Sequence, residues 1–494
     1  MLSTAAQARF MKGLEGIIRP DHLADDTGTL GGYAKDCSFA RERMPWLAVY
    51  PQNREQVQHI VKLANEYRIP LVPVSSGPPR FRGDTVPAEN GVIVDFGRMK
   101  RIIKVDPISR YAMIEPGVTY AELVPELKKH GLRLCTPLLP RSTKSVVTSR
   151  LEREPVLIPK YQYDDVDPLL TLEVVYGTGD DFRTGSASGP GPLETLKADK
   201  VNPWGPGAID FFRFVSGAQG TMGLVTWAVV KTEVLPSLRK LYFIPLSQPE
   251  ELAAPMDLLL RRRVVDECLA LNNVSLAAML AESLPGDWES LKAALPAWTI
   301  IACIAGYERY PEERVAVQER YLRDICRGLN LKPEPLLPGA EDRFDEVSEL
   351  LSVPWRKEPY WKLRRKGSCH DIFFLAPIRK APEYIRLMNS FVARNRYPAD
   401  EVGCYVQPMV QGRGCHCEFN LPCDQADDQE AAEVQRLFID ASETLIRKGA
   451  FFSRPYGPWA DMVYSRYGEG VTVLRQLKNI FDPNHILNPG KLCF

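Results

Sequence analysis

The sequence predicts an α+β protein of more than one domain, and three observations support this class. The chain has 494 residues, which is too long for one simple core. Segments of helical period and β-branched segments occur together along it. The pattern also changes after Pro236, where longer helical stretches begin to alternate with strands. We therefore expect a first domain over residues 1–236 and an α+β second domain over 237–452.

Composition gives no reason to expect a nucleic acid or membrane partner. Apolar residues make up 45% of the chain and charged residues 25%, and Lys+Arg equals Asp+Glu at 62 each. No segment reaches the length of a membrane span. The first residues show no charged region followed by an apolar core, so we expect a cytoplasmic protein with its 11 cysteines reduced.

The densest cysteine patch, residues 403–424, suggests a metal site at Cys415, His416 and Cys417. Neighbouring residues on a strand face opposite sides, so the two cysteines would share one face and His416 the other. Three such side chains cannot easily bind one ion. We therefore expect buried free thiols and no metal.

The first domain begins with elements that local patterns define well. Residues 53–70 place apolar side chains at helical spacing and end at Pro70. Thr119 begins another helix, and Glu122 three residues later completes a capping box. Strands are expected over 71–74, 91–96, 101–106 and 111–117, a hairpin around 177–179, and a glycine turn over 217–223 followed by a strand.

The segment PVSSGPPRFRGDTVP, residues 73–87, follows a predicted strand and is rich in Ser, Gly and Pro. It also carries Arg80 and Arg82. Loops of this kind hold phosphates with their backbone N–H groups. This loop is therefore a candidate anion-binding site.

These segments, in this order, resemble the vanillyl-alcohol oxidase and p-cresol methylhydroxylase family of FAD-linked oxidoreductases. The resemblance implies a PCMH-type FAD-binding domain of two α+β parts, completed by the tail 453–494, and an α+β cap domain over the substrate. It rests on YPQNREQVQHIVKLANEYRIPLVPVSSG, GVIVDFGRMKRIIKVD, EPGVTYAEL, SVVTSRLERE, SGAQGTMGLVT and FDPNHILNPGK.

The resemblance implies that the loop 75–85 wraps the FAD pyrophosphate and that the glycine turn approaches the cofactor closely. The sequence departs from the family where Pro78 and Pro79 enter the loop, and Thr148 and Ser149 replace a Gly-Asn pair and would crowd the flavin. The residues expected at FAD are Val74, Ser75, Ser76, Gly77, Gly83, Asp84, Thr85, Ser145, Val146, Thr148, Ser149, Gly220, Thr221, Gly223, Leu224, Val225, Asn488 and Lys491.

Some members attach FAD to a histidine of the cap domain. In GSCHDIFFLAP, residues 367–377, His370 lies near that position, and a shifted alignment places Ile372 there instead. We favour non-covalent FAD, with a covalent bond to His370 as the alternative.

The resemblance also implies which residues carry the chemistry, in which hydride passes from the substrate to flavin N5. Arg454 corresponds to an arginine that stabilises phenolates. Arg82 falls where the family has a substrate-facing tyrosine, and it could bind an anionic substrate or the FAD phosphates. Together they would suit a carboxylate. His416 could take a proton from a hydroxyl, with Tyr456 and Tyr464 as acid/base partners. The alternatives are a surface ion pair for Arg454, a solvated Arg82 and a core His416.

The predicted function is FAD-dependent oxidation of a C–H or C–OH group, in a hydroxylated aromatic of the p-alkylphenol or benzylic alcohol type. One alternative is a degenerate, flavin-poor subunit that serves as a binding or assembly partner. Another is a 2-hydroxy-acid dehydrogenase of the glycolate or lactate type, although the tail segment FSRPYGPW lacks the metal-binding histidine of many such enzymes. A homodimer or larger oligomer and an electron-transfer subunit are the expected protein partners.

Overall fold

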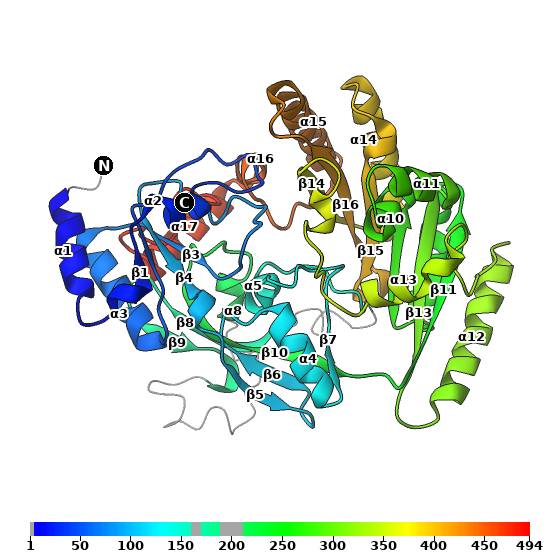
Figure 1. Cartoon of the computed structure of the whole chain (residues 1–494), viewed down its shortest axis with the longest axis horizontal. Coiled ribbons are helices and arrows are strands. Elements are labelled where there is room, and N and C mark those ends of the chain that lie inside the picture. Colours follow the sequence, from blue (N-terminus) through cyan, green and yellow to red (C-terminus); the bar gives the residue numbers. More distant parts are fainter. Residues whose placement is uncertain (1–3, 160–168, 188–210) are drawn as a thin grey trace.

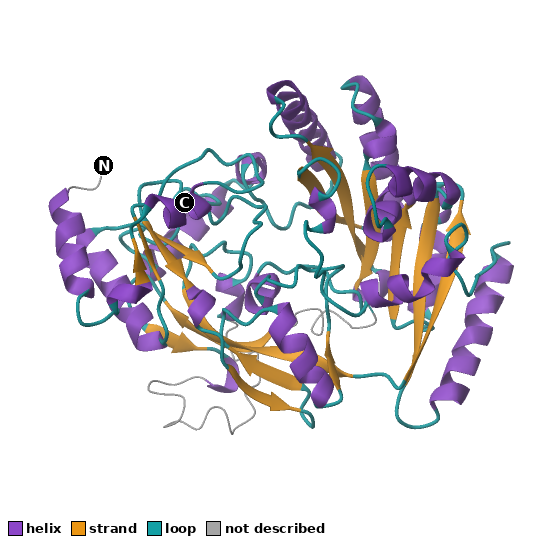
Figure 2. Ribbon diagram, viewed as in Figure 1, coloured by secondary structure: helices purple, strands orange, loops and turns teal. Residues whose placement is uncertain are grey.

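The computed structural model describes residues 4–159, 169–187 and 211–494. These residues form three β-sheets with helices packed around them (Figure 1). The first two sheets lie in one half of the molecule and the third sheet lies in the other (Figure 2). The predicted α+β class is confirmed.

The first sheet has the strand order β1-β2-β4-β3, with β2, β4 and β3 parallel. The predicted helix is α3 (Arg54–Tyr67), which buries its apolar face in this core; it begins after the Asn53 cap, and Arg68 ends it in the left-handed conformation. The strands are β1 (Leu23–Ala24), β2 (Leu47–Val49), β3 (Leu71–Val74) and β4 (Val92–Asp95), and α1 (Thr4–Leu14) and α2 (Thr27–Ala34) precede α3.

The second sheet is antiparallel, with β10 at its centre. The Glu122 carboxylate accepts the Thr119 N–H at 2.8 Å, so the capping box is confirmed, as is the β8–β9 hairpin. The strands are β5 (Ile102–Asp106), β6 (Tyr111–Ile114), β7 (Leu132–Leu134), β8 (Leu169–Val175), β9 (Asp181–Arg183) and β10 (Leu224–Val234), with helices α4 (Tyr120–Lys129), α5 (Val146–Leu151) and α8 (Phe212–Val215).

The third sheet has the order β11-β13-β12-β15-β16-β14 and lies within the range 237–452. Its strands are β11 (Leu238–Leu246), β12 (Glu267–Asn272), β13 (Trp298–Gly306), β14 (Ser368–Ala376), β15 (Gly403–Met409) and β16 (Gly414–Cys423). The predicted domain boundaries stay a prediction.

Both faces of the third sheet pack against helices. One face is covered by α9 (Ala253–Arg261), α12 (Pro311–Gly328), α14 (Ala381–Arg394) and α15 (Asp428–Arg447). The other face packs on α10 (Asn273–Leu280), α11 (Gly286–Ala294) and α13 (Phe344–Leu350), and over β14–β16 it borders a cavity. The short helix η6 (Trp361–Leu363) lies at that cavity.

The C-terminal tail returns from the third sheet to the first two through α16 (Pro458–Tyr464) and α17 (Glu469–Phe481) (Figure 1). Leu487 forms a parallel bridge with Leu71 of β3, and Lys478 of α17 is fully buried. Among the described residues, no helix combines the length and apolarity needed to cross a membrane.

Candidate active site

A cavity lies between the loops of the first two sheets and the third sheet, on the face of β14–β16 opposite α14 and α15. On one side it is lined by the loop after β3, by one face of α5 and by the glycine turn before β10. On the other side it is lined by η6, by residues of β14, β15 and β16, and by Arg454 and Tyr456. One cavity therefore contains the predicted anion-binding loop and the predicted substrate residues.

The loop after β3 is bonded on one side to α5 and to the turn that precedes this helix. The hydroxyls of Ser75 and Thr148 form a hydrogen bond, and Ser145 donates its N–H to Ser76 Oγ at 3.0 Å. Arg141 donates to the carbonyl of Gly77 at 2.8 Å. These contacts hold the backbone of the loop in place.

The tail holds the same loop from the other side. Asn488 Nδ2 donates to the carbonyls of Asp84 at 2.9 Å and Gln219 at 2.7 Å, so one side chain joins the loop to the glycine turn. Lys491 Nζ donates to the carbonyl of Gly83 at 2.7 Å. Asn488 and Lys491 therefore do not line the cavity but hold the backbone of its walls in place.

Two glycines allow the glycine turn to pack tightly beside the cavity. Gly220 has φ +72°, and a Cβ there would lie closer than 3.0 Å to Cγ of Pro73. A Cβ at Gly223 would likewise lie closer than 3.0 Å to the side chain of Val174. The turn is therefore tightly packed against its own domain, and its predicted close approach to the cofactor stays a prediction.

The structure divides the predicted cofactor residues into two groups. The first group lines the cavity: Val74, Ser75, Ser76, Asp84, Thr85, Thr148, Gly220, Gly223, Leu224 and Val225. The second group does not line it and lies behind the loops or away from them: Gly77, Gly83, Ser145, Val146, Ser149, Thr221, Asn488, Lys491 and His370.

Two expectations differ from the structure. Ser149 does not face the cavity, because its hydroxyl donates to Glu154 at 2.6 Å and pairs with Tyr120, so only Thr148 narrows the space there. His370 does not face it either: its ring stacks on Phe39 with centroids 3.8 Å apart. Strand alternation places His370 on the helix-covered face of the third sheet and Asp371 in the cavity.

All four predicted catalytic residues line the cavity: Arg454, Arg82, His416 and Tyr456. The guanidinium groups of Arg82 and Arg454 lie 4.4 Å and 4.3 Å from the centre of the Phe373 ring. Arg82 also approaches Asp371 at 3.4 Å, whereas Arg454 has no ion-pair partner within the described part of the chain. Arg454 is only 5% exposed, so it is a buried cation that faces the cavity. Tyr464 does not line the cavity.

A second charged group in the cavity, which was not predicted from the sequence, consists of Lys362, Asp371 and Glu418. Lys362 Nζ lies 2.7 Å from Asp371 and also bonds Glu418. Asn420 donates to Asp371 at 2.7 Å and to Glu418 at 2.8 Å. A single acidic residue in each of two largely apolar strands is the signal that could have revealed this group, because buried carboxylates need partners.

His416 contacts this group directly. Its Nε2 lies 3.1 Å from Glu418 and 3.2 Å from the Tyr405 hydroxyl, which donates to Glu418 at 2.8 Å. Burial lowers the pKa of His416, so its ring is neutral at pH 7. Burial also raises the pKa of Tyr456 well above its usual range, which keeps that hydroxyl protonated.

The loop side of the cavity has its own charged group. Lys144 Nζ lies 2.7 Å from each of the carboxylates of Glu152 and Glu154. Burial favours the neutral acid, but Lys144 nevertheless lowers the pKa of Glu154 to about 2. No lysine or arginine of the described segments forms an ion pair with Asp84, and burial together with the charge of Glu152 raises its pKa to about 6.

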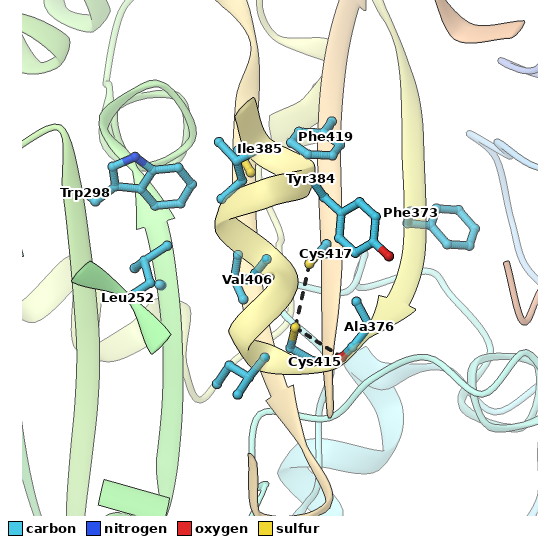
Figure 3. Close-up of a cluster of buried hydrophobic side chains, with 14 of the residues drawn as sticks. Leu252, Trp298, Phe373, Ala376, Tyr384, Ile385, Val406, Cys415, Cys417 and Phe419 are labelled. Carbon is cyan, nitrogen blue, oxygen red and sulfur yellow. Dashed lines mark hydrogen bonds between the residues drawn. The ribbon is translucent and has the colours of Figure 1, made fainter. Parts of the chain in front are cut away.

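The predicted cysteine arrangement is present on the opposite face of the third sheet. Cys415 and Cys417 have sulfur atoms 3.7 Å apart in an apolar cluster beneath α14 (Figure 3), whereas His416 faces the cavity. The hydrogen bond with Cys415, together with burial, raises the pKa of the Cys417 thiol well above its usual range. The Cys417 thiol is therefore poorly reactive.

The residues of the cavity fit FAD. The walls beside the anion-binding loop offer the hydroxyls of Ser75, Ser76 and Thr148, and the buried Thr85 Oγ1 has no hydrogen-bond partner in the described ranges. The glycine turn forms the adjoining wall, including Gly220. Hydroxyl donors and exposed backbone are the groups that bind a diphosphate.

Two family models match the chain. One, described as an FAD binding domain, matches residues 45–146, and the other, described as the C-terminal domain of FAD linked oxidases, matches residues 411–492. The first match contains the loop after β3, and the second contains His416, Glu418 and Arg454.

Comparisons with individual proteins cover nearly the whole chain. It is 23% identical to the glycolate oxidase subunit GlcD of Bacillus subtilis, covering 96% of this chain and 94% of that protein. It is 24% identical to the 4-cresol dehydrogenase [hydroxylating] flavoprotein subunit of Pseudomonas putida, covering 90% and 87%. The crystal structure of p-cresol methylhydroxylase with bound substrate has the same fold, with a TM-score of 0.83, 18% identity and coverage of 100% and 98%.

Proposed function

This chain belongs to the PCMH-type family of FAD-linked oxidases and dehydrogenases, and on that basis we propose that it oxidises a C–H or C–OH group of a hydroxylated aromatic compound. FAD, when bound, supplies the acceptor for the hydride that leaves the substrate. The contribution of the protein is to bind the substrate anion, to orient it and to hold its proton.

The main support for this proposal is the environment of Arg454. It is a buried guanidinium that faces the cavity with no ion-pair partner among the described residues. A buried charge without a partner is costly, so such a site favours a ligand that supplies an anion. A phenolate satisfies this requirement, and a charge-assisted hydrogen bond to it is strong in a cavity that excludes water.

The walls around Arg454 support an aromatic substrate. Phe373 lies beneath both arginines, and the rings of Tyr456, Tyr405 and Trp361 line the same end. Aromatic side chains bind flat apolar rings through edge and face contacts. We further propose that His416, as a neutral imidazole, takes the proton of a substrate hydroxyl.

A 2-hydroxy acid is the second candidate substrate, because Arg82 and Arg454 both approach one ring and could bind one carboxylate together. The relative named glycolate oxidase subunit GlcD supports this alternative. The flavin-poor subunit is set aside, since the chain is an FAD-linked oxidoreductase.

Anaerobic flavin reduction separates the two candidates. The purified holoenzyme is mixed with 4-ethylphenol, 4-hydroxybenzyl alcohol, glycolate or D-lactate, and bleaching of the flavin absorbance is followed. We expect the phenols to reduce the flavin and the hydroxy acids to leave it oxidised. The opposite result would favour the second candidate and contradict the proposal.

The role of Arg454 is tested with the substrate that this assay identifies. Arg454→Met should retain flavin and lose about a hundredfold in reduction rate, which corresponds to about 3 kcal/mol of lost transition-state stabilisation. Arg466→Met, which removes an exposed arginine elsewhere in the tail, is the matched control and should reduce normally. An unchanged rate in Arg454→Met would assign that arginine to structure alone.

We also propose that the chain works with an electron-accepting subunit and forms oligomers in the cytoplasm. The relative named as a flavoprotein subunit supports the first point. Mass measurement of the native protein by light scattering checks the oligomeric state, and a monomer would contradict it.

A further inference from the structure

Lys362 joins two carboxylates that belong to different strands of the third sheet. Its Nζ lies 2.7 Å from Asp371 of β14 and also bonds Glu418 of β16. The two acidic side chains are only 2% and 3% exposed, and that of Lys362 is 10% exposed. A buried ion triad of this kind is specific in geometry, because each charge is costly without the others.

The charge of Lys362 decides the protonation of Glu418. Two carboxylates held this close cannot easily both ionise unless a cation lies between them. Burial raises the pKa of Glu418, but the charge of Lys362 and the bond with His416 bring it well below its usual range. Glu418 is therefore an anion at neutral pH and can only accept hydrogen bonds.

An anionic Glu418 in turn determines the tautomer of His416. Glu418 Oε2 lies 3.1 Å from His416 Nε2 and already accepts the Tyr405 hydroxyl at 2.8 Å. Two bare acceptors at 3.1 Å would repel each other, so Nε2 must carry the hydrogen. Nδ1 is then the only ring nitrogen that can accept a proton, and it is buried without a partner in the described part of the chain.

We propose that Lys362 is a positioning residue, which keeps Glu418 ionised and thereby holds His416 in the tautomer with hydrogen on Nε2 and a bare Nδ1. The groups that face His416 are Glu418 on its own strand, Tyr405 on β15, Lys362 on η6 and Arg454 after α15. Lys362 is the one lysine or arginine within hydrogen-bonding distance of Glu418 in the described ranges.

Removal of Lys362 should change the protonation of His416 in one direction, so that Nδ1 gains a hydrogen. Without the cation, the pair takes up one proton from solvent: Glu418 becomes a neutral acid whose O–H donates to Nε2, and the ring changes tautomer so that its own hydrogen is on Nδ1. If His416 instead becomes the cation that pairs with Glu418, both ring nitrogens carry hydrogen. Nδ1 is protonated in either case.

Long-range ¹H–¹⁵N correlation spectra of the histidine-labelled holoenzyme measure this state directly. The chain has 6 histidines, and the His416→Gln variant identifies the signals of His416 by their absence. At pH 7 we expect a bare Nδ1 and a protonated Nε2 in the wild type. Lys362→Gln and Lys362→Met should both show loss of the bare Nδ1 signal, and Lys362→Arg should retain it.

Lys144→Met is the matched control, because Lys144 also joins two buried carboxylates of this cavity but does not contact Glu418. It should leave the His416 signals unchanged. If Lys362→Met does not fold, Lys362→Gln keeps hydrogen-bonding capacity while removing the charge and decides the test. A bare Nδ1 that persists in the Lys362→Gln variant would overturn the proposal.

The consequence for turnover rests on the proposed function, in which His416 accepts the substrate proton. A positioned base contributes roughly 10²–10⁴-fold to rate, and Lys362→Gln should lose a part of this that Lys362→Arg restores. The tautomer is measured without substrate. A failed spectroscopic test therefore refutes the role of Lys362, whereas a normal turnover rate with a changed tautomer refutes the role of His416.

Discussion

Gly220 provides a sharp test of how the glycine turn shapes the cavity, because Gly217 in the same turn is its natural control. Both have positive φ, +72° and +74°. A Cβ at Gly220 would lie closer than 3.0 Å to Cγ of Pro73 and 3.0 Å from its Cδ, whereas a Cβ at Gly217 would meet nothing within 4 Å. Alanine at the two positions therefore imposes similar backbone strain, but only one variant causes a clash.

The expected loss of folding stability is the sum of the backbone strain and the steric clash. A left-handed conformation costs a non-glycine residue about 1–2 kcal/mol, so Gly217→Ala should destabilise the protein by that amount. Overpacking adds about 1–3 kcal/mol, which brings Gly220→Ala to about 2–5 kcal/mol. Pro73 belongs to β3 and borders the cavity, so the clash should also displace the strand that leads into the anion-binding loop.

The midpoint of thermal unfolding and the ratio of flavin to protein absorbance measure the two effects. We expect Gly217→Ala to lower the midpoint slightly and to retain flavin. Gly220→Ala should lower the midpoint further and lose flavin on gel filtration. Equal midpoints and equal flavin contents in the two variants would refute this account of the turn.

Three further predictions concern the tail, the flavin linkage and pH. Lys478→Met should destabilise the protein by about 3–5 kcal/mol in urea unfolding, because Lys478 pairs with the fully buried Asp482 at 2.5 Å; a loss below 1 kcal/mol would contradict this. His370→Ala should retain flavin, and acid precipitation should release flavin from wild type and variant alike; flavin that stays with the wild-type pellet would show a covalent bond. The pKa of Asp84 is raised to about 6 by burial and by Glu152, so the folded protein binds more protons there than the unfolded chain. Flavin-free protein should therefore lose stability as pH rises from about 4 to about 6, and Asp84→Asn should lose less; equal pH dependence of the two unfolding midpoints would refute this.

Local chemistry explains what could be predicted from the sequence. The helix 54–67 and strand 71–74 were predictable because apolar spacing and a following proline define them without distant contacts. The capping box at Thr119 is equally local. The candidate residues Arg82, His416, Arg454 and Tyr456 line one cavity, although their roles stay predictions.

Contacts between distant segments explain what could not be predicted. Lys362 and Asp371 are near each other in the chain, but Glu418 lies 56 residues after Lys362 and reaches this pair because β14 pairs with β16 in one register. His370 shows how sensitive the face assignment is: a shift of one residue exchanges the two faces of a strand, and Asp371 lines the cavity instead.

The charged residues at the end of the cavity that contains Arg454 and His416 restrict the net charge of the substrate. Among the described residues that line this end, the cations are Lys362, Arg82 and Arg454, the carboxylates are Asp371 and Glu418, and His416 is neutral. The balance is one positive charge, which a phenolate or a monocarboxylate neutralises. A dicarboxylate such as 2-hydroxyglutarate would instead leave one buried negative charge without a partner, which is strongly unfavourable. We therefore expect 2-hydroxyglutarate to leave the flavin oxidised under conditions in which a monoanionic substrate bleaches it; rapid anaerobic bleaching by the dicarboxylate would show that this end contains more positive charge than these residues provide.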